Sequence, residues 1–143
     1  MAVSATLGMT TVQAQTDDYA EVNRLVRSGQ LAEALALVGE AARRCLQLQP
    51  HAVQLLAARA LVQGRIVEMA TGEGKSLTAA LAAAVLGSCG LPVHVYTVND
   101  YLAQRDALAL QPLYQRMGLR VAVLAGPQGS PQRRAAHAAD VLY

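Results

Sequence analysis

Apolar residues between positions 18 and 63 recur every three or four residues, with polar residues between them. This period matches one face of an α-helix, and it is carried by Leu31, Leu35, Val38, Ala42 and Cys45. Asp17 and Asp18 have side chains that favour a helix N-cap, while Gly29 and Pro50 interrupt the helical pattern. The pattern therefore predicts several short helices over residues 18–63.

From position 65 onward, short apolar runs alternate with longer helical stretches. The predicted strands cover residues 65–70, 93–98 and 120–125 and a segment starting at Val141, and the predicted helices cover residues 74–86 and 100–117 and a short stretch near Pro131. Strands that alternate with such helices indicate βαβ units and a parallel sheet. We therefore expect an α/β fold with an incomplete parallel sheet, preceded by helices. Because the chain ends in its last strand, we expect that strand to form an exposed edge.

The N-terminal residues 1–17 and the longest apolar run, residues 77–91, carry no recognisable chemical motif. Residues 1–17 are rich in Ser, Thr and Gln and have no apolar period, so we expect them to be disordered. They also lack the charged start of a signal peptide. The longest apolar run, residues 77–91, is shorter than the ~20 residues that span a bilayer and is interrupted by glycine. It is predicted to be a buried helix, and we expect a cytoplasmic protein.

Composition limits both the core and the partners. Hydrophobic residues make up 53% of the chain, but Phe and Trp are absent, so small aliphatic side chains must form the core. A net charge of +2 with 15% charged residues is too weak for a nucleic-acid-binding face. Cys45 and Cys89 stand far apart without the spacing of a zinc site, so both are predicted to be unpaired core thiols.

The motif TGEGKS at residues 71–76 contains the one lysine among twelve Lys and Arg residues. It lies between a predicted strand and a predicted helix, where backbone N–H groups and the positive helix end face the same space. Gly72 and Gly74 allow the backbone to curl around a phosphate. Lys75 can reach the β- and γ-phosphates, and the Ser76 hydroxyl can bind Mg²⁺. A compact ammonium suits this site better than a planar guanidinium.

A second motif narrows the interpretation. TVNDYLAQRD at residues 97–106, continued by PLYQRMGLRVAVL and AADVLY, resembles the SecA preprotein translocase ATPase family, whose phosphate loop has the form TGEGK followed by Thr or Ser. Upstream, the stretch LQPHAVQLLAARALVQGRIV is similar to the adenine-recognising Q motif of that family. The resemblance covers residues 50–143 and is thinner over residues 29–49.

The resemblance implies a P-loop NTPase fold of the RecA-like, superfamily 2 helicase type. A partial nucleotide-binding domain would occupy residues 64–143, after N-terminal helices at residues 18–63 that include the Q motif. Asn99 to Asp106 would lie near the transported polymer, as the matching motif does in related helicases. Asn99 fits equally well as the N-cap of the following helix.

The resemblance also implies the nucleotide-binding residues. Gln54 would read adenine, because an amide can donate to and accept from the base edge. Thr71, Gly72, Glu73, Gly74, Lys75 and Ser76 would bind the phosphates of ATP, with Glu73 contributing mainly its backbone N–H, and Ser76 would bind Mg²⁺. Around the base the chain departs from the family, since Gln49, Pro50, His51 and Ala52 stand where Arg-Pro-Phe-Asp is usual. His51 is a candidate to stack on adenine, or a surface residue.

By the same resemblance, the chain would be the ATP-binding portion of a motor that couples ATP hydrolysis to preprotein export across a membrane. Its partners would be a SecYEG-type membrane channel and unfolded preproteins rather than nucleic acid, and a homo-oligomer is compatible with the resemblance. The protein would be cytoplasmic and peripheral to the inner (plasma) membrane.

Beyond residue 76 the sequence shows no pair of neighbouring acidic residues of the kind that ATP hydrolysis requires. Such motors need an acidic pair and an arginine finger, but Asp140 has no neighbouring carboxylate and Glu68 precedes the phosphate loop. We therefore assign no catalytic residue and expect an N-terminal piece that does not hydrolyse ATP alone. Two alternatives stay open: a superfamily 2 nucleic-acid helicase fragment, and a non-catalytic interaction module. Met69 at the first glycine position of the strict motif is compatible with a vestigial loop in such a module.

Overall fold

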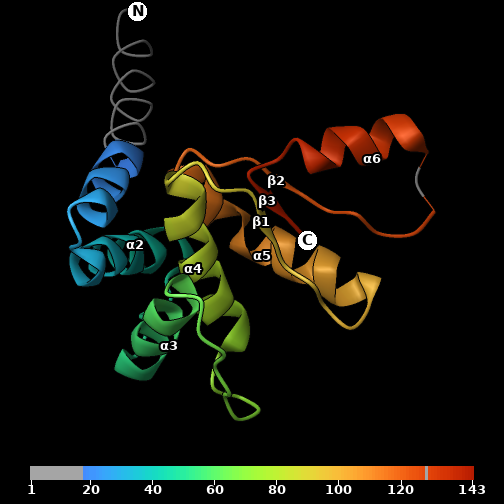
Figure 1. Cartoon of the computed structure of the whole chain (residues 1–143). Coiled ribbons are helices and arrows are strands. Elements are labelled where there is room, and N and C mark those ends of the chain that lie inside the picture. The colour runs from blue at the N-terminus through green and yellow to red at the C-terminus, as the bar shows by residue number, and fades with distance from the viewer. Residues whose placement is uncertain (1–17, 128) are drawn as a thin grey trace, which may run out of the picture.

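The computed structural model describes residues 18–127 and 129–143. Residues 1–17, expected to be disordered, and the N-cap candidate Asp17 lie outside this range. A helical segment over residues 18–27 is followed by α2 (Leu31–Leu46), α3 (Ala52–Val62), α4 (Lys75–Ser88), α5 (Asp100–Arg116) and α6 (Ser130–His137), and by the strands β1 (Val93–His94), β2 (Val121–Ala122) and β3 (Val141–Leu142) (Figure 1). Helices and strands occur in the predicted order, with one exception described below.

The three strands form a parallel sheet in the order β1-β3-β2. Val141 of β3 pairs with Val93 of β1 and with Val121 of β2. Further backbone bonds extend the pairing, because the Val95 N–H donates to Leu142 over 2.8 Å and the Leu124 N–H donates to Tyr143 over 2.7 Å. The parallel sheet is therefore confirmed, although its strands are shorter than predicted.

The position of the last strand differs from the expectation. β3 was expected to form an exposed edge, but it lies between β1 and β2 and its two residues are buried. The reason is the path of the chain. After β1 the chain passes through α5 to β2, which leaves room for one strand between β1 and β2. After β2 the chain returns through α6, and β3 fills the place between them.

The predicted strand over residues 65–70 is wrong. The structure assigns no strand there, and Ile66 is fully exposed. An apolar run becomes a strand when a neighbouring strand takes up its backbone hydrogen bonds. Here the carbonyl oxygens of Met69 and Ala70 instead accept hydrogen bonds from the Lys75 ammonium. The segment thus forms an extended connection between α3 and α4, outside the sheet (Figure 1).

The core is built around α4. Residues 80–85 of this helix are all buried, and α4 contacts α2, α3, α5 and β1. Small side chains permit this close packing, and at Gly87 an added Cβ would lie 3.0 Å from the side chain of Leu119. The apolar run at residues 77–91 therefore contributes a buried helix, as predicted. Among the described residues, no helix is long and apolar enough to cross a membrane.

Polar contacts join distant parts of the chain around this core. Asp18 lies within the first helical segment, and its carboxylate accepts a 2.7 Å hydrogen bond from Arg116 of α5. The hydroxyl groups of Tyr114 and Tyr143 lie 2.7 Å apart in the interior. Cys45 and Cys89 are unpaired as predicted, but they are half-buried rather than fully buried, and burial raises the pKa of both thiols.

We expect the free energy of unfolding to decrease above about pH 10. Burial is the main cause that raises the pKa of both tyrosine hydroxyl groups. The pKa of Tyr114 is raised, and that of Tyr143 is raised to about 12. An unfolded tyrosine loses its proton near pH 10. Between about pH 10 and 12 the unfolded state therefore binds fewer protons than the folded state, which lowers stability. Urea unfolding at several pH values measures this loss. Tyr114→Phe should reduce the dependence on pH, and a free energy of unfolding that stays constant over this range would contradict the assignment.

Candidate functional site

The TGEGKS segment runs from an exposed turn into the first two residues of α4. Thr71 to Glu73 form a turn, and Gly74 is the N-cap residue of α4. Gly72 has a φ of 90° and Gly74 a φ of 77°, values that glycine adopts far more readily than other residues. The two glycines therefore permit the curled backbone that the sequence predicted at these positions.

Gln54 of α3 reaches this loop from the side. Its Nε2 donates to the Glu73 carbonyl over 2.9 Å, and its Oε1 accepts from the His51 N–H over 2.9 Å. The side chain is buried, so it is not a solvated helix residue. A Cβ at Gly74 would collide with Gln54 Nε2, so a larger residue there would displace the end of the Gln54 side chain from its present position.

Lys75 folds back over the start of its own loop. Its Nζ donates to the carbonyl oxygens of Ala70, at 2.9 Å, and Met69, at 3.2 Å, and the side chain remains exposed. An ammonium has three donors, so these contacts leave one of them over. Both acceptors are neutral, and a phosphate oxygen would form stronger, charge-assisted bonds. The lysine is therefore placed to exchange loop carbonyls for an anion.

Ser76 contacts a residue thirty positions away in the sequence. Its Oγ donates a 2.7 Å hydrogen bond to Oδ2 of Asp106, which lies on α5. In the sequence Asp106 stands out only as the end of the TVNDYLAQRD motif, and nothing there indicates this contact. The spacing alone carries no signal for it, because the contact arises from the packing of α4 against α5.

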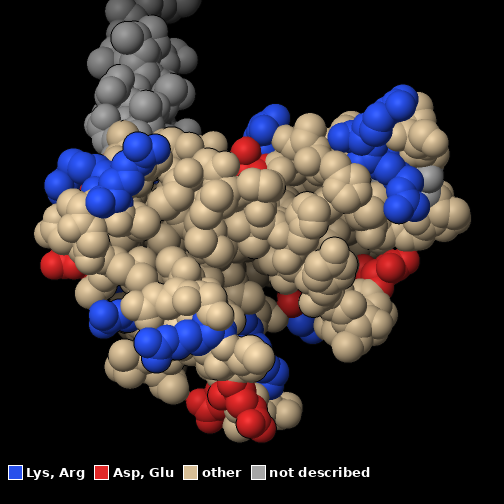
Figure 2. All heavy atoms as spheres, in the orientation of Figure 1, with Lys and Arg blue, Asp and Glu red and all other residues tan. Residues whose placement is uncertain are grey.

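The chemistry available at the loop is anion binding at a helix N-terminus. The first N–H groups of a helix have no partner within the helix, and no side chain among the described residues caps α4. The charge around the loop is mixed. Figure 2 shows acidic side chains gathered at the lower end of the molecule, where Figure 1 places the α3–α4 connection that carries Glu68 and Glu73. Attraction of an anion therefore depends on Lys75 and the nearby N–H groups rather than on a broad positive field.

The TVNDYLAQRD motif begins at the carboxyl end of β1. The Asn99 side chain accepts from the Leu102 N–H over 2.9 Å, which confirms it as the N-cap of α5. The Asp100 carboxylate accepts from the Gly126 N–H over 2.8 Å. The predicted site residues thus form two groups: Gln54 joins residues 71–76, while the start of the second motif lies elsewhere.

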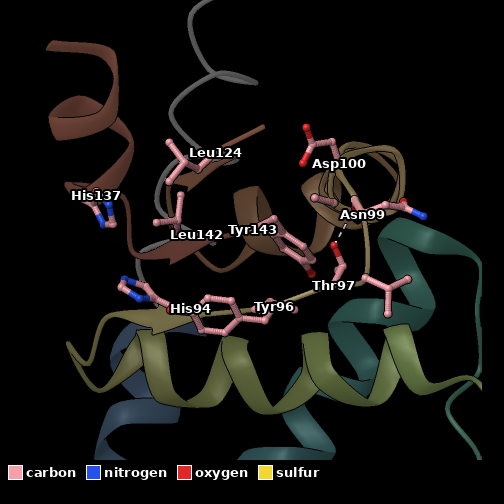
Figure 3. A pocket seen from close by; sticks show the side chains of 12 residues that line it. His94, Tyr96, Thr97, Asn99, Asp100, Leu124, His137, Leu142 and Tyr143 are labelled. Atoms are coloured by element: carbon pink, nitrogen blue, oxygen red, sulfur yellow. Dashed lines mark hydrogen bonds between the residues drawn. The ribbon is translucent and has the colours of Figure 1, made fainter. Parts of the chain in front are cut away.

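A cavity of about 260 Å³ adjoins the start of this motif. It is lined by side chains from the ends of β1 and β3, the first turn of α5, and His137 of α6 (Figure 3). The rings of His94 and His137 lie 5.6 Å apart, centre to centre. Residues 71–76 do not contribute to this cavity. No cluster of three metal-ligating side chains occurs within residues 18–127 and 129–143.

Comparison with known proteins identifies relatives of the chain. A family model described as the SecA DEAD-like domain matches residues 4–143. The chain is 48% identical over 113 residues to a protein translocase subunit SecA of Treponema pallidum, covering 79% of the chain and 12% of that protein. It is 43% identical over 144 residues to a protein translocase subunit SecA 2 of Bordetella avium, covering 99% of the chain and 22% of that protein. The chain therefore spans between about an eighth and a fifth of the length of these relatives.

Replacing Gln54 tests how much its contact with the loop stabilises the fold. Gln54→Leu removes two part-buried hydrogen bonds, one from the His51 N–H and one to the Glu73 carbonyl. A hydrogen bond contributes about 0.5–1.5 kcal/mol, which makes about 1–3 kcal/mol for the two. We expect a loss of that size in the free energy of unfolding, measured with urea. Gln104→Leu, at an exposed position of α5, should change it by less than about 0.5 kcal/mol. Equal stability of the two variants would show that the Gln54 contacts contribute little.

Proposed function

Because the chain belongs to the family of the SecA DEAD-like domain, we propose that it is the ATP-binding part of a protein translocase motor, with a P-loop NTPase fold of the RecA-like type. The observation that carries this proposal is the exposed TGEGKS loop at the N-terminus of a buried helix. In this loop the one lysine of the chain donates to two neutral carbonyl groups, those of Met69 and Ala70. This arrangement has the donors that a nucleotide phosphate requires.

The residues at the loop fit a Mg²⁺–nucleotide. Thr71 to Ser76 provide backbone N–H groups at the helix end, Lys75 provides an ammonium, and the Ser76 hydroxyl provides an oxygen that suits Mg²⁺. When bound, ATP would supply the phosphoryl group whose transfer to water drives such a motor. The part played by this chain is to bind and orient the phosphates. Lys75 would exchange the carbonyl groups of Met69 and Ala70 for phosphate oxygens.

Gln54 is the proposed contact for adenine, and its present hydrogen bonds show which of its donors and acceptors are already in use. Both ends of its amide are engaged, one by the His51 N–H and one by the Glu73 carbonyl. These bonds use one of the two N–H donors and one of the two oxygen lone pairs of the amide. Gln54 would therefore read the base either with the remaining donor and lone pair or by exchanging its present contacts. Because Glu73 belongs to the phosphate loop, binding of the base would then be linked to the conformation of the loop.

Hydrolysis and transport are proposed for the whole translocase rather than for these 143 residues. Asp106, a carboxylate in contact with Ser76, is already engaged by Ser76 and Arg105. We propose that the longer protein couples hydrolysis to the export of unfolded preproteins through a SecYEG-type channel. It would act from the cytoplasm, peripheral to the inner membrane. The support is the naming of its relatives as protein translocase subunits.

Calorimetric binding of Mg²⁺–ADP to the 143-residue chain tests the proposed site. Lys75→Ala should weaken binding by roughly 10- to 100-fold, because hydrogen bonds to charged groups contribute about 1.5–3 kcal/mol. Lys75→Arg should restore little of this affinity, since the planar guanidinium does not fit the space of an ammonium. Arg65→Ala removes one positive charge from an exposed position of the same connection and should leave affinity nearly unchanged.

Two outcomes would contradict the proposal. One is the absence of binding by a wild-type chain that circular dichroism shows to be folded. The other is an equal loss of affinity in Lys75→Ala and Arg65→Ala, which would indicate general electrostatic attraction instead of a phosphate site. Either result would favour a vestigial loop in an interaction module.

A further inference from the structure

The hydrogen bond between Ser76 and Asp106 joins the phosphate loop to α5. Ser76 is the second residue of α4, and Asp106 lies in the middle of α5. The Asp106 side chain is 13% exposed. Its Oδ2 accepts from Ser76 over 2.7 Å, and its Oδ1 accepts from the Arg105 guanidinium over 2.6 and 2.8 Å. Both carboxylate oxygens are therefore engaged, one by the Ser76 hydroxyl and the other by the Arg105 guanidinium.

The chemistry of the two groups determines where the hydroxyl proton lies. A carboxylate in an ion pair accepts hydrogen bonds and does not donate them, whereas a hydroxyl has one proton and two lone pairs. Ser76 must therefore donate its proton to Asp106. The lone pairs of Ser76 Oγ then point away from the carboxylate. These lone pairs are the part of the hydroxyl that a Mg²⁺ ion requires.

We propose that Asp106 is a positioning residue for the metal ion that accompanies the nucleotide. It holds the Ser76 hydroxyl with its proton turned toward α5, so that the oxygen is ready to bind Mg²⁺. The carboxylate also increases the electron density on that oxygen, as hydrogen-bonded partners of metal ligands commonly do. This inference rests on the proposed nucleotide site and adds to it a residue outside the loop.

Two other roles for Asp106 make different predictions. A carboxylate that merely joins α4 to α5 would affect folding, and with it nucleotide binding in the presence and absence of Mg²⁺ alike. A carboxylate that competes with Mg²⁺ for Ser76 would weaken metal binding, so its removal would strengthen the effect of Mg²⁺. The quantity that separates all three roles is the gain in ADP affinity that Mg²⁺ produces.

The experiment measures ADP binding to the 143-residue chain by calorimetry, once with excess Mg²⁺ and once with a chelator. Asp106→Asn keeps the shape of the side chain but removes its charge. We expect its affinity in the chelator to stay within about twofold of wild type. The gain in affinity from Mg²⁺ should fall by roughly 10- to 100-fold, or disappear where the wild-type gain is smaller. Ser76→Ala should lose the same gain, and the double variant should lose no more than either single variant.

Asp18→Asn is the matched control. It also removes a mostly buried carboxylate, 20% exposed, that pairs with an arginine of α5, but its partner Arg116 is the last residue of that helix. Its Mg²⁺ gain should equal that of the wild type. Asp106→Ser is measured beside Asp106→Asn, because the amide oxygen of Asn can still accept from the Ser76 hydroxyl, whereas a serine side chain is too short to reach it. The same selective loss is expected, and this variant also serves if Asp106→Asn does not fold.

The possible results separate this inference from the proposed function. Failure of the folded wild-type chain to bind ADP under either condition contradicts the nucleotide site itself. If the wild type binds, a Mg²⁺ gain that is unchanged in both Asp106→Asn and Asp106→Ser overturns the positioning role. An equal loss with and without Mg²⁺ would assign Asp106 to structure alone, and an increased gain would identify it as a competitor of the metal ion.

Discussion

The structure depends on the burial of α4. This helix is apolar on most of its surface, and the alanines among residues 80–85 allow α2, α3 and α5 to approach it closely. Close packing of this kind leaves little room for displacement, because any shift opens voids that cost free energy. The N-terminus of α4 is therefore held in place, and the exposed turn at residues 71–73 that leads into it has a fixed support.

Two polar side chains add to this support from different helices. Gln54 of α3 holds the backbone at Glu73, and Asp106 of α5 holds the Ser76 hydroxyl. The TGEGKS segment is thus connected to α3 by the Gln54–Glu73 hydrogen bond and to α5 by the Ser76–Asp106 hydrogen bond. A ligand that moves Glu73 acts on α3, and a ligand that moves Ser76 acts on α5. Since α5 begins within the TVNDYLAQRD motif, the two motifs are physically connected through Asp106.

Local patterns predicted most of the fold. The spacing of Leu31, Leu35 and Val38 identified α2, and α4 and α5 begin within one residue of their predicted starts. These elements follow from side-chain periodicity and capping, which depend on near neighbours in the sequence. The strand predicted at residues 65–70 failed for the opposite reason. A strand exists only with a partner, and here the carbonyl oxygens of Met69 and Ala70 accept hydrogen bonds from the Lys75 side chain rather than from another strand.

The sequence by itself determined the chemistry at the candidate site, because TGEGKS specifies two glycines, an ammonium and a hydroxyl at one helix end. It also indicated Gln54 through its resemblance to the Q motif. Tertiary structure alone decided which groups those residues contact. The Ser76–Asp106 bond spans thirty residues and the Gln54–Glu73 bond nineteen. Such contacts depend on how helices pack, and packing is set by the whole core, whereas the conformation of a loop glycine is set by its own backbone.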